Sequence, residues 1–427
     1  KYDLANKYYD DVILASSNQD FKADSYLSKG MIAFNSGQVE VAIEGFLFVV
    51  NNYQHSKYFK EALSGLQAAY SSIAKVDEYL AVIESLPEVS ISKAEQDSLT
   101  YNTALMKFSE LEYEVAKAAF TKYIERFNNG IFINDAIYYN AICSEKTADT
   151  LTALKNYEKV VLRGVAIYQE RALLYLARSF YNKDNYEKSN VYYISLVEFA
   201  SSNSIKREAI IRLMTGFENV DNFIAFEYAN QVIELDKKDD WLLSKAYIII
   251  ARNEFENGNY AKSKNTFKKV TKLSAYDEGA EAKYYLAYLT YLDEDLVLAE
   301  QMIFELADVY SSDRFIAKAF ILLSDIYVEQ ENNFQAKATL ESIIKNHDGE
   351  DLVNIAREKW EVILEQEKEI VVEEIEEQSY IEISEDGFEY EVKEFDEGYV
   401  VPIPDTTNLP MDSLEIINKN ILEDEIE

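Results

Sequence analysis

The hydrophobic positions of this chain are spaced like those of packed helices. A small residue and a bulky one stand four positions apart in the pairs Ala42/Phe46, Ala116/Phe120 and Ser263/Phe267. Residues four apart lie on one face of an α-helix, so each pair predicts a helix whose small residue admits a neighbour. Turn-forming residues precede these helices, as at 35–37 and 256–260. The pattern therefore predicts helix hairpins.

The hairpin pattern returns along the chain every 36 to 38 residues. A first small residue recurs at Gly30, Ala104, Ala141, Ala177, Ala251, Ala287 and Ser324, and the intermediate steps fall at Gln67 and Leu213. Twelve residues after these positions stand Ala42, Ala116, Ala153, Ser189, Ala225, Ser263, Ala299 and Ala336. Self-similarity at this period is typical of solenoids. We expect an all-α, right-handed superhelical solenoid of about nine hairpins over residues 21–349.

Several segments resemble the tetratricopeptide repeat. Leu176-Ala177 and Phe180, followed by Asn185-Tyr186, Ser189 and Tyr193, match it best, and the resemblance extends over roughly residues 1–364. The long period, and Tyr53-Gln54-His55-Ser56 where the family often has Tyr-Pro-x-Ser, are most similar to bacterial envelope members such as the Tol-Pal coordinator and the helical lipoprotein of outer-membrane barrel assembly. The resemblance implies a scaffold that binds other proteins.

The two ends of the repeat region differ from its middle. One period before Gly30, Ala5 and Tyr9 occupy the small and bulky positions of a second helix, so residues 1–20 are predicted to be half of a hairpin. We expect this chain to be the C-terminal part of a longer array. An amphipathic run with Leu352 and Ala356 predicts a capping helix over residues 350–368.

The net charge of −35 is distributed unevenly. Residues 365–427 contain 22 acidic residues against three lysines, and three of the four prolines follow residue 400. We therefore assign residues 369–427 to a separate acidic tail. A strongly anionic surface disfavours binding to nucleic acids and to anionic lipid. The longest apolar runs, such as 246–251, are too short to span a bilayer.

The sequence has no signature of catalysis, of a metal site or of a cofactor. Two histidines, His55 and His347, cannot form a two-histidine motif four residues apart, and one cysteine excludes a thiolate zinc site. No Gly-x-Gly pair is present for a phosphate-binding loop. Cys143 is interpreted as a packed apolar residue, with a redox role as the alternative.

The family's ligand-binding positions lie on the first helix of each repeat, and they map here onto bases and aromatics. The resemblance implies a partner-binding groove formed by Arg171, Arg178, Tyr181, Arg207, Phe217, Lys245, Arg252, Phe255, Tyr284, Tyr288 and Tyr291. The alternative is structural: the bases pair with nearby acids such as Glu170, Glu208 and Glu254, while the aromatics pack between repeats. An anionic guest, either the acidic tail or a partner segment, is the ligand that this surface predicts.

The tail contains two candidate partner-binding elements. Alternating apolar and polar residues around Asp386-Gly387 predict a β-hairpin over residues 379–393, and a capping-box pattern at Asp412 predicts a helix over 412–426. A lone hairpin is marginal in water, so it would be stable only by adding to the edge of a partner's sheet or by packing on the solenoid. The alternative for the whole tail is a solvated acidic linker. The residues that would bind are Tyr380, Ile381, Ile383, Phe388, Tyr390, Val392, Leu414, Ile417 and Ile421.

These observations predict a non-enzymatic protein-interaction scaffold. The envelope resemblance places it on the periplasmic side of a bacterial outer-membrane or cell-envelope complex, without a transmembrane segment in this chain. Two alternatives remain open: a cytoplasmic assembly or chaperone-adaptor scaffold, and a substrate-presenting module of an enzyme whose catalytic part lies upstream.

Overall fold

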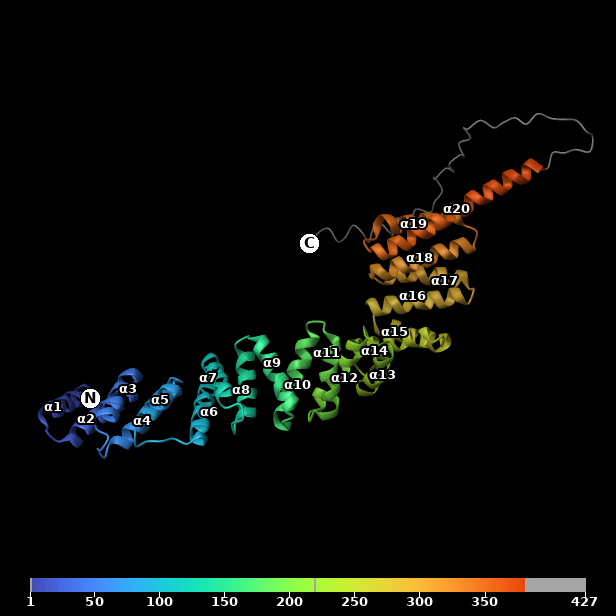
Figure 1. Cartoon of the computed structure of the whole chain (residues 1–427). Helices are drawn as coiled ribbons and strands as arrows, with labels where there is room; N and C mark the ends of the chain where they lie inside the picture. The colour runs from blue at the N-terminus through green and yellow to red at the C-terminus, as the bar shows by residue number, and fades with distance from the viewer. Residues whose placement is uncertain (1, 219, 381–427) are drawn as a thin grey trace, which may run out of the picture. The chain divides into compact units, whose positions relative to one another are not determined.

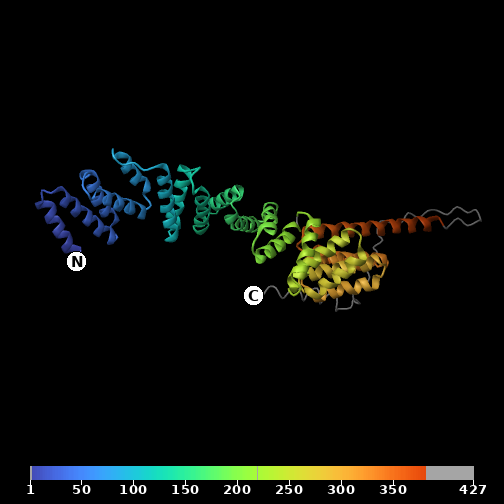
Figure 2. The same cartoon turned by 90° about the horizontal axis from the view of Figure 1, so that it is seen from below.

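The computed structural model describes residues 2–218 and 220–380, and every regular element in these ranges is an α-helix. The chain divides into two units, residues 1–360 and 361–427. Twenty helices are present in the described residues, and consecutive helices of the first unit lie side by side (Figures 1 and 2). The all-α, hairpin-repeat prediction is therefore confirmed.

The helices alternate between two roles. The first helices of the hairpins, here called A helices, are α2 (Gln19–Asn35), α4 (Phe59–Ser72), α6 (Lys93–Ser109), α8 (Ile133–Lys146), α10 (Ala166–Tyr181), α12 (Asn203–Phe217), α14 (Asp240–Glu256), α16 (Asp277–Leu292) and α18 (Asp313–Glu329). Their partners, the B helices, are α3 (Val39–Asn52), α5 (Val76–Ser85), α7 (Tyr113–Arg126), α9 (Thr150–Arg163), α11 (Tyr186–Phe199), α13 (Asn222–Leu235), α15 (Tyr260–Leu273), α17 (Leu296–Val309) and α19 (Asn333–Asn346). Helix α1 (Tyr2–Ala15) precedes these nine hairpins and α20 (Glu350–Tyr380) follows them.

The turn from A to B helix has the same construction in nearly every hairpin. One residue is left-handed, with φ of 76° at Gly37, 54° at Asp184 and 72° at Gly258. The next residue donates its N–H to the carbonyl five positions back, as in Asn185 to Phe180 and Asn259 to Glu254. This bond closes the A helix in the manner of a Schellman motif. The turn therefore sets the start of the B helix at a constant distance from the end of the A helix.

The small residues that recur along the sequence lie in the core between the helices. All eight small residues of the B helices, from Ala42 to Ala336, have no exposed surface. Two of them are serines, and each hydroxyl donates at 3.0 Å to a carbonyl on the paired A helix: Ser189 to Ala177 and Ser263 to Ala251. These bonds satisfy the buried hydroxyls, so serine can replace alanine where the helices touch.

Two predictions need correction: the place of Gln67 in the repeat, and the end of the capping helix. Gln67 is exposed, and its neighbour Leu66 is fully buried instead. The paired helix α5 is only ten residues long, so the second hairpin departs from the common pattern. Helix α20 does not end at residue 368 but continues to Tyr380, so residues 379 and 380 of the candidate hairpin are helical. Ala5 and Tyr9 of α1 are both half-buried.

Candidate protein-binding surface

No group of three or more His, Cys, Asp or Glu in the described residues is placed to hold a metal ion, and none of their helices has the length and apolarity needed to cross a membrane. Cys143 is fully buried, and burial raises the pKa of its thiol to about 12. A thiol with so high a pKa is a poor nucleophile, which favours the packing role over the redox role.

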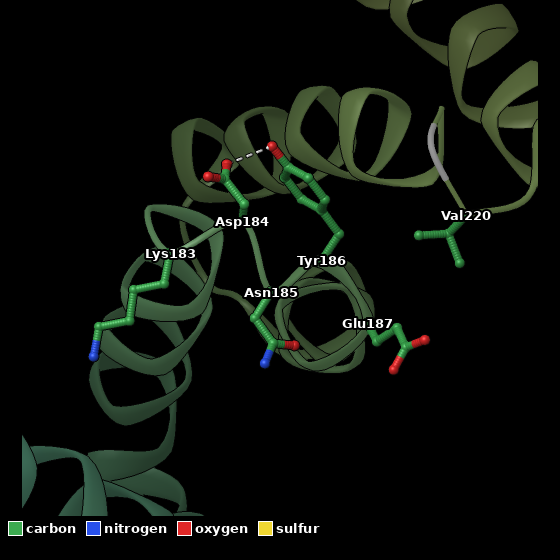
Figure 3. Close-up of a pocket in the computed structure, with 6 residues that line it drawn as sticks. All are labelled: Lys183, Asp184, Asn185, Tyr186, Glu187 and Val220. Atoms are coloured by element: carbon green, nitrogen blue, oxygen red, sulfur yellow. Dashed lines mark hydrogen bonds between the residues drawn. The ribbon is translucent and has the colours of Figure 1, made fainter.

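A surface pocket of about 420 Å³ opens at the turn between α10 and α11 (Figure 3). Three of its polar side chains, those of Asp184, Asn185 and Tyr186, already have structural partners. The Tyr186 hydroxyl donates to Asp184 at 2.8 Å, and the Asn185 side chain accepts the backbone N–H of Lys188 at 3.2 Å, capping α11. The pocket is therefore explained by turn geometry, and it presents no nucleophile beside a base.

The five bases predicted for the groove lie on successive A helices, and each has a carboxylate partner. The N–O distances are 3.1 Å for Arg171–Glu145, 2.5 Å for Arg178–Glu208, 2.6 Å for Arg207–Asp236 and 2.6 Å for Arg252–Glu218, with further pairs Lys245–Glu278 and Arg252–Glu281. The acids lie on neighbouring A helices or at the ends of helices beside them. These ion pairs connect successive repeats. An anionic ligand would have to compete with the chain's own carboxylates for the bases.

Of the three acids expected to neutralise these bases, one does so. Glu208 accepts two hydrogen bonds from the Arg178 guanidinium, at 2.7 and 2.5 Å. Glu170 instead accepts from the Ser201 hydroxyl at 2.8 Å, and Glu254 accepts from Thr266 at 2.7 Å. The five bases thus form ion pairs within the chain, as the structural alternative expects, although two of the three acids belong to other contacts. The role of these bases in partner binding stays a prediction.

The Arg178–Glu208 pair makes stability depend on pH. Hydrogen bonds from Arg178 lower the pKa of Glu208 below its ordinary value of 4.5, so the pair stabilises the fold above that pH and is lost as the pH falls through the lowered pKa. We expect Glu208→Gln to cost about 1 kcal/mol at pH 7. The difference in melting temperature from the parent should shrink towards pH 3.5. Exposed Glu187→Gln is the control, and a Glu208→Gln penalty that is equal at both pH values would contradict this account.

The aromatics of repeats five and six pack between helices. The Tyr181 hydroxyl is 2.7 Å from the Thr215 hydroxyl of the next A helix, and the Arg212 guanidinium lies 4.5 Å from the Tyr181 ring centroid. Phe217 is 9% exposed and stacks on Tyr228 of the paired B helix at 6.0 Å. At these two positions the packing role is the one that the geometry supports.

Repeats seven to nine present a continuous group of rings, here called the aromatic cluster: Phe255 on α14, Tyr284, Tyr288 and Tyr291 on α16, and Phe315 on α18. Their centroids are 6.0 Å apart for Phe255–Tyr288, 6.3 Å for Tyr284–Tyr288, 6.4 Å for Tyr288–Tyr291 and 6.3 Å for Tyr284–Phe315. All five side chains are half-buried. The cluster therefore joins three A helices while leaving part of each ring at the surface.

Lys318 lies at the edge of the aromatic cluster and, unlike the five predicted bases, forms no ion pair with the described residues. Its ammonium nitrogen is 5.9 Å from the Tyr284 centroid and 5.3 Å from that of Phe315, a cation–π arrangement. Burial lowers the pKa of Lys318 and the nearby Arg314 lowers it further, and these effects outweigh the raising influence of Glu281 and Asp351. No carboxylate of the described residues forms an ion pair with it, whereas Arg314 pairs with Asp351 at 3.1 Å.

Lys318 was missed by the sequence reasoning, although the register contained the signal. Arg171, Arg207 and Lys245 each stand six residues before the first small marker of their repeat, and Lys318 stands six before Ser324. Extending the base positions to the last hairpin would have found it. The sequence could not predict that Lys318 forms no ion pair, because this depends on how α18 lies against its neighbouring helices.

The predicted tail surface falls almost wholly outside the described residues. Tyr380 is the last residue of α20. The remaining positions lie beyond the described ranges, and so do nearly all of the candidate hairpin and the whole candidate helix: Ile381, Ile383, Phe388, Tyr390, Val392, Leu414, Ile417 and Ile421. Their role in partner binding stays a prediction.

The helices and their repeated contacts define the class of fold: an all-α solenoid of helix hairpins. No protein-family model and no curated protein matches the sequence. Among solved structures, the P58(IPK) TPR domain is similar at 14% identity and TM-score 0.30, covering 81% of this chain and 99% of that chain. The C-terminal part of a TPR repeat-containing protein from Cytophaga hutchinsonii is similar at 16% identity and TM-score 0.38, covering 60% of this chain and 98% of that chain. Yeast Tom70 is similar at 12% identity and TM-score 0.35, covering 88% of this chain and 96% of that chain. The class rests on the helix register described above.

Proposed function

We propose that this chain is a non-enzymatic scaffold that binds a partner protein on the aromatic cluster and Lys318. The observation that supports this most is the unmatched charge of Lys318. The five bases predicted for the A-helix face each form an ion pair within the chain, while Lys318 is half-buried against rings and forms none with the described residues. Glu281 and Asp351 attract this charge from beyond ion-pair distance, yet burial still lowers the pKa of Lys318. A partner carboxylate in direct contact would offset that cost of burial.

The surroundings of Lys318 specify the chemistry of the partner segment. The half-buried rings of Tyr284 and Tyr288 offer apolar area with polar edges, which is typical of protein-binding hot spots. An acidic residue beside an apolar or aromatic one would meet both features together. Such a segment gains a charge-assisted hydrogen bond at Lys318 and buries its apolar side chain on the rings.

Affinity capture with the tagged full chain from the native host, under mild detergent, tests this proposal. The double variant Tyr288→Ala/Lys318→Gln should reduce the recovered partner at least about tenfold, as expected from losing one ring and one charge at a binding centre. The control Tyr8→Ala/Lys155→Gln removes the same residue types from exposed positions and should recover the partner normally. Equal recovery by the two double variants would overturn the proposal. Lys318→Gln alone, which leaves the packing of the rings intact, should give an intermediate loss.

We also propose that the protein works in the periplasm of a bacterium, as part of an outer-membrane or cell-envelope complex. The support is the long period and the closing sequence at 53–56, both of which resemble envelope members of the tetratricopeptide family. Fractionation of host cells tests the location: the natural gene product should appear in the envelope or osmotic-shock fraction. Recovery in the cytosolic fraction alone would contradict it.

A further inference from the structure

Helix α15 has a composition unlike the rest of this acidic protein. Its fourteen residues contain five lysines, Lys262, Lys264, Lys268, Lys269 and Lys272, and no aspartate or glutamate. With 3.6 residues per turn, these lysines fall on the half of the helix opposite the buried Ser263, Phe267 and Val270. The outward face of α15 therefore carries five lysines and no acid, besides the exposed Ala261 and Asn265, on a chain whose net charge is −35.

The charge of this face is mostly unmatched within the chain. Lys264 pairs with Asp293 at 2.8 Å, and the Lys269 ammonium lies 4.8 Å from the Tyr247 ring centroid. Lys262, Lys268 and Lys272 are exposed, and across the part of the chain that the structure describes no carboxylate lies within ion-pair distance of them. This differs from the A-helix face, where the five predicted bases are all paired.

The arrangement is unfavourable for the helix itself. Lys264 and Lys268 are four residues apart, and so are Lys268 and Lys272, so like charges face each other along one side. Such pairs destabilise a helix, and nothing in α15 offsets them with an acid. An external anion would supply the missing counter-charges.

The size of the basic face limits what can bind it. Fourteen helical residues extend about 21 Å, and exposed acids stand at both ends, Glu256 on α14 and Asp277 on α16. A nucleic acid strand or an anionic bilayer would extend past these ends and meet repelling carboxylates. An extended acidic peptide of about six residues matches the length.

We infer that the outward face of α15 binds a short acidic segment of a partner polypeptide, at a surface separate from the aromatic cluster. The carboxylates of that segment would pair with Lys262, Lys268 and Lys272. Because these pairs are exposed, the interaction is electrostatic in character and weakens as salt rises.

Fluorescence anisotropy with the full chain and a labelled octaglutamate peptide, at low and at physiological salt, tests the inference. The triple variant Lys262→Gln/Lys268→Gln/Lys272→Gln should weaken binding about tenfold, as three exposed ion pairs of ordinary strength would. The control Lys60→Gln/Lys93→Gln/Lys155→Gln removes the same net charge from exposed lysines on other helices and should change affinity less than about twofold. The triple Lys→Arg variant of α15 should bind as the parent does.

Three results would overturn the inference. Equal weakening by the two Gln triples would show that the peptide senses only the net charge. Octaglutamate that fails to bind the parent at low salt would show that the face has no affinity for acidic segments. Tighter binding of a uridine octanucleotide, or of phosphatidylserine vesicles, that is lost in the α15 triple would assign the face to another class of ligand.

Discussion

Replacing Arg252 with methionine is expected to destabilise the array by about 2–3 kcal/mol. Burial lowers the pKa of this guanidinium, but hydrogen bonds and charge interactions with Glu281 and Glu218 outweigh that effect and raise the pKa above its ordinary value. The Glu281 side chain is only 7% exposed, so methionine would leave a buried carboxylate without its counter-ion. Losing one partner of a buried pair costs about 3–5 kcal/mol, and the 33% exposure of Arg252 reduces that figure.

A double-mutant cycle with Glu281→Gln separates pairing from packing. The double variant should recover part of the loss, because the uncompensated charge is then absent. Thermal or urea unfolding measures both changes. Additive losses from the two substitutions would mean that the pairing with Glu281 contributes nothing, and that Arg252 stabilises the repeats through Glu218 or its aliphatic contacts.

Replacing Ala287 with phenylalanine should lower stability by about 1–3 kcal/mol or more. Ala287 is the first small marker of the eighth hairpin and has no exposed surface, because a neighbouring helix passes over it. A benzyl group at this position would have to push the helices apart, and overpacking of this kind costs that much.

Val297→Phe is the matched control for this substitution. It adds a ring on the paired B helix α17, at a position that is 75% exposed, and its melting temperature should stay close to that of the parent. If Ala287→Phe melted at the same temperature as the parent, the recurring small residues would not mark the positions where neighbouring helices touch.

The hairpins could be predicted from the sequence because their signal is local and repeated. A small residue, a turn and a bulky residue recur at fixed offsets, so errors in one repeat, such as Gln67, do not affect the others. The bases of the A helices were placed on one face for the same reason. The acids that pair with these bases could not be predicted in this way. Arg171 pairs with an acid 26 residues away, and Arg252 pairs with acids 29 and 34 residues away. No single offset predicts these pairs, since they depend on how each helix lies on the next.

The length of α20 was underestimated because its end was inferred from the loss of hydrophobic periodicity. Residues 365–378 are rich in glutamate and glutamine, which favour helix through intrinsic propensity. The helix therefore continues past the last repeat-like position to Tyr380. Propensity, read separately from periodicity, would have predicted the longer helix.

Site-specific photocrosslinking in the native host tests the central claim most directly, namely that the aromatic cluster is the partner-binding surface. p-Benzoylphenylalanine is introduced at Tyr288, and for comparison at Phe199 and Phe334, which are 66% and 53% exposed on B helices. We predict a discrete adduct from position 288 that is lost when Lys318→Gln is added, and no such adduct from 199 or 334. Adducts from the two B-helix positions, with none from 288, would contradict the account.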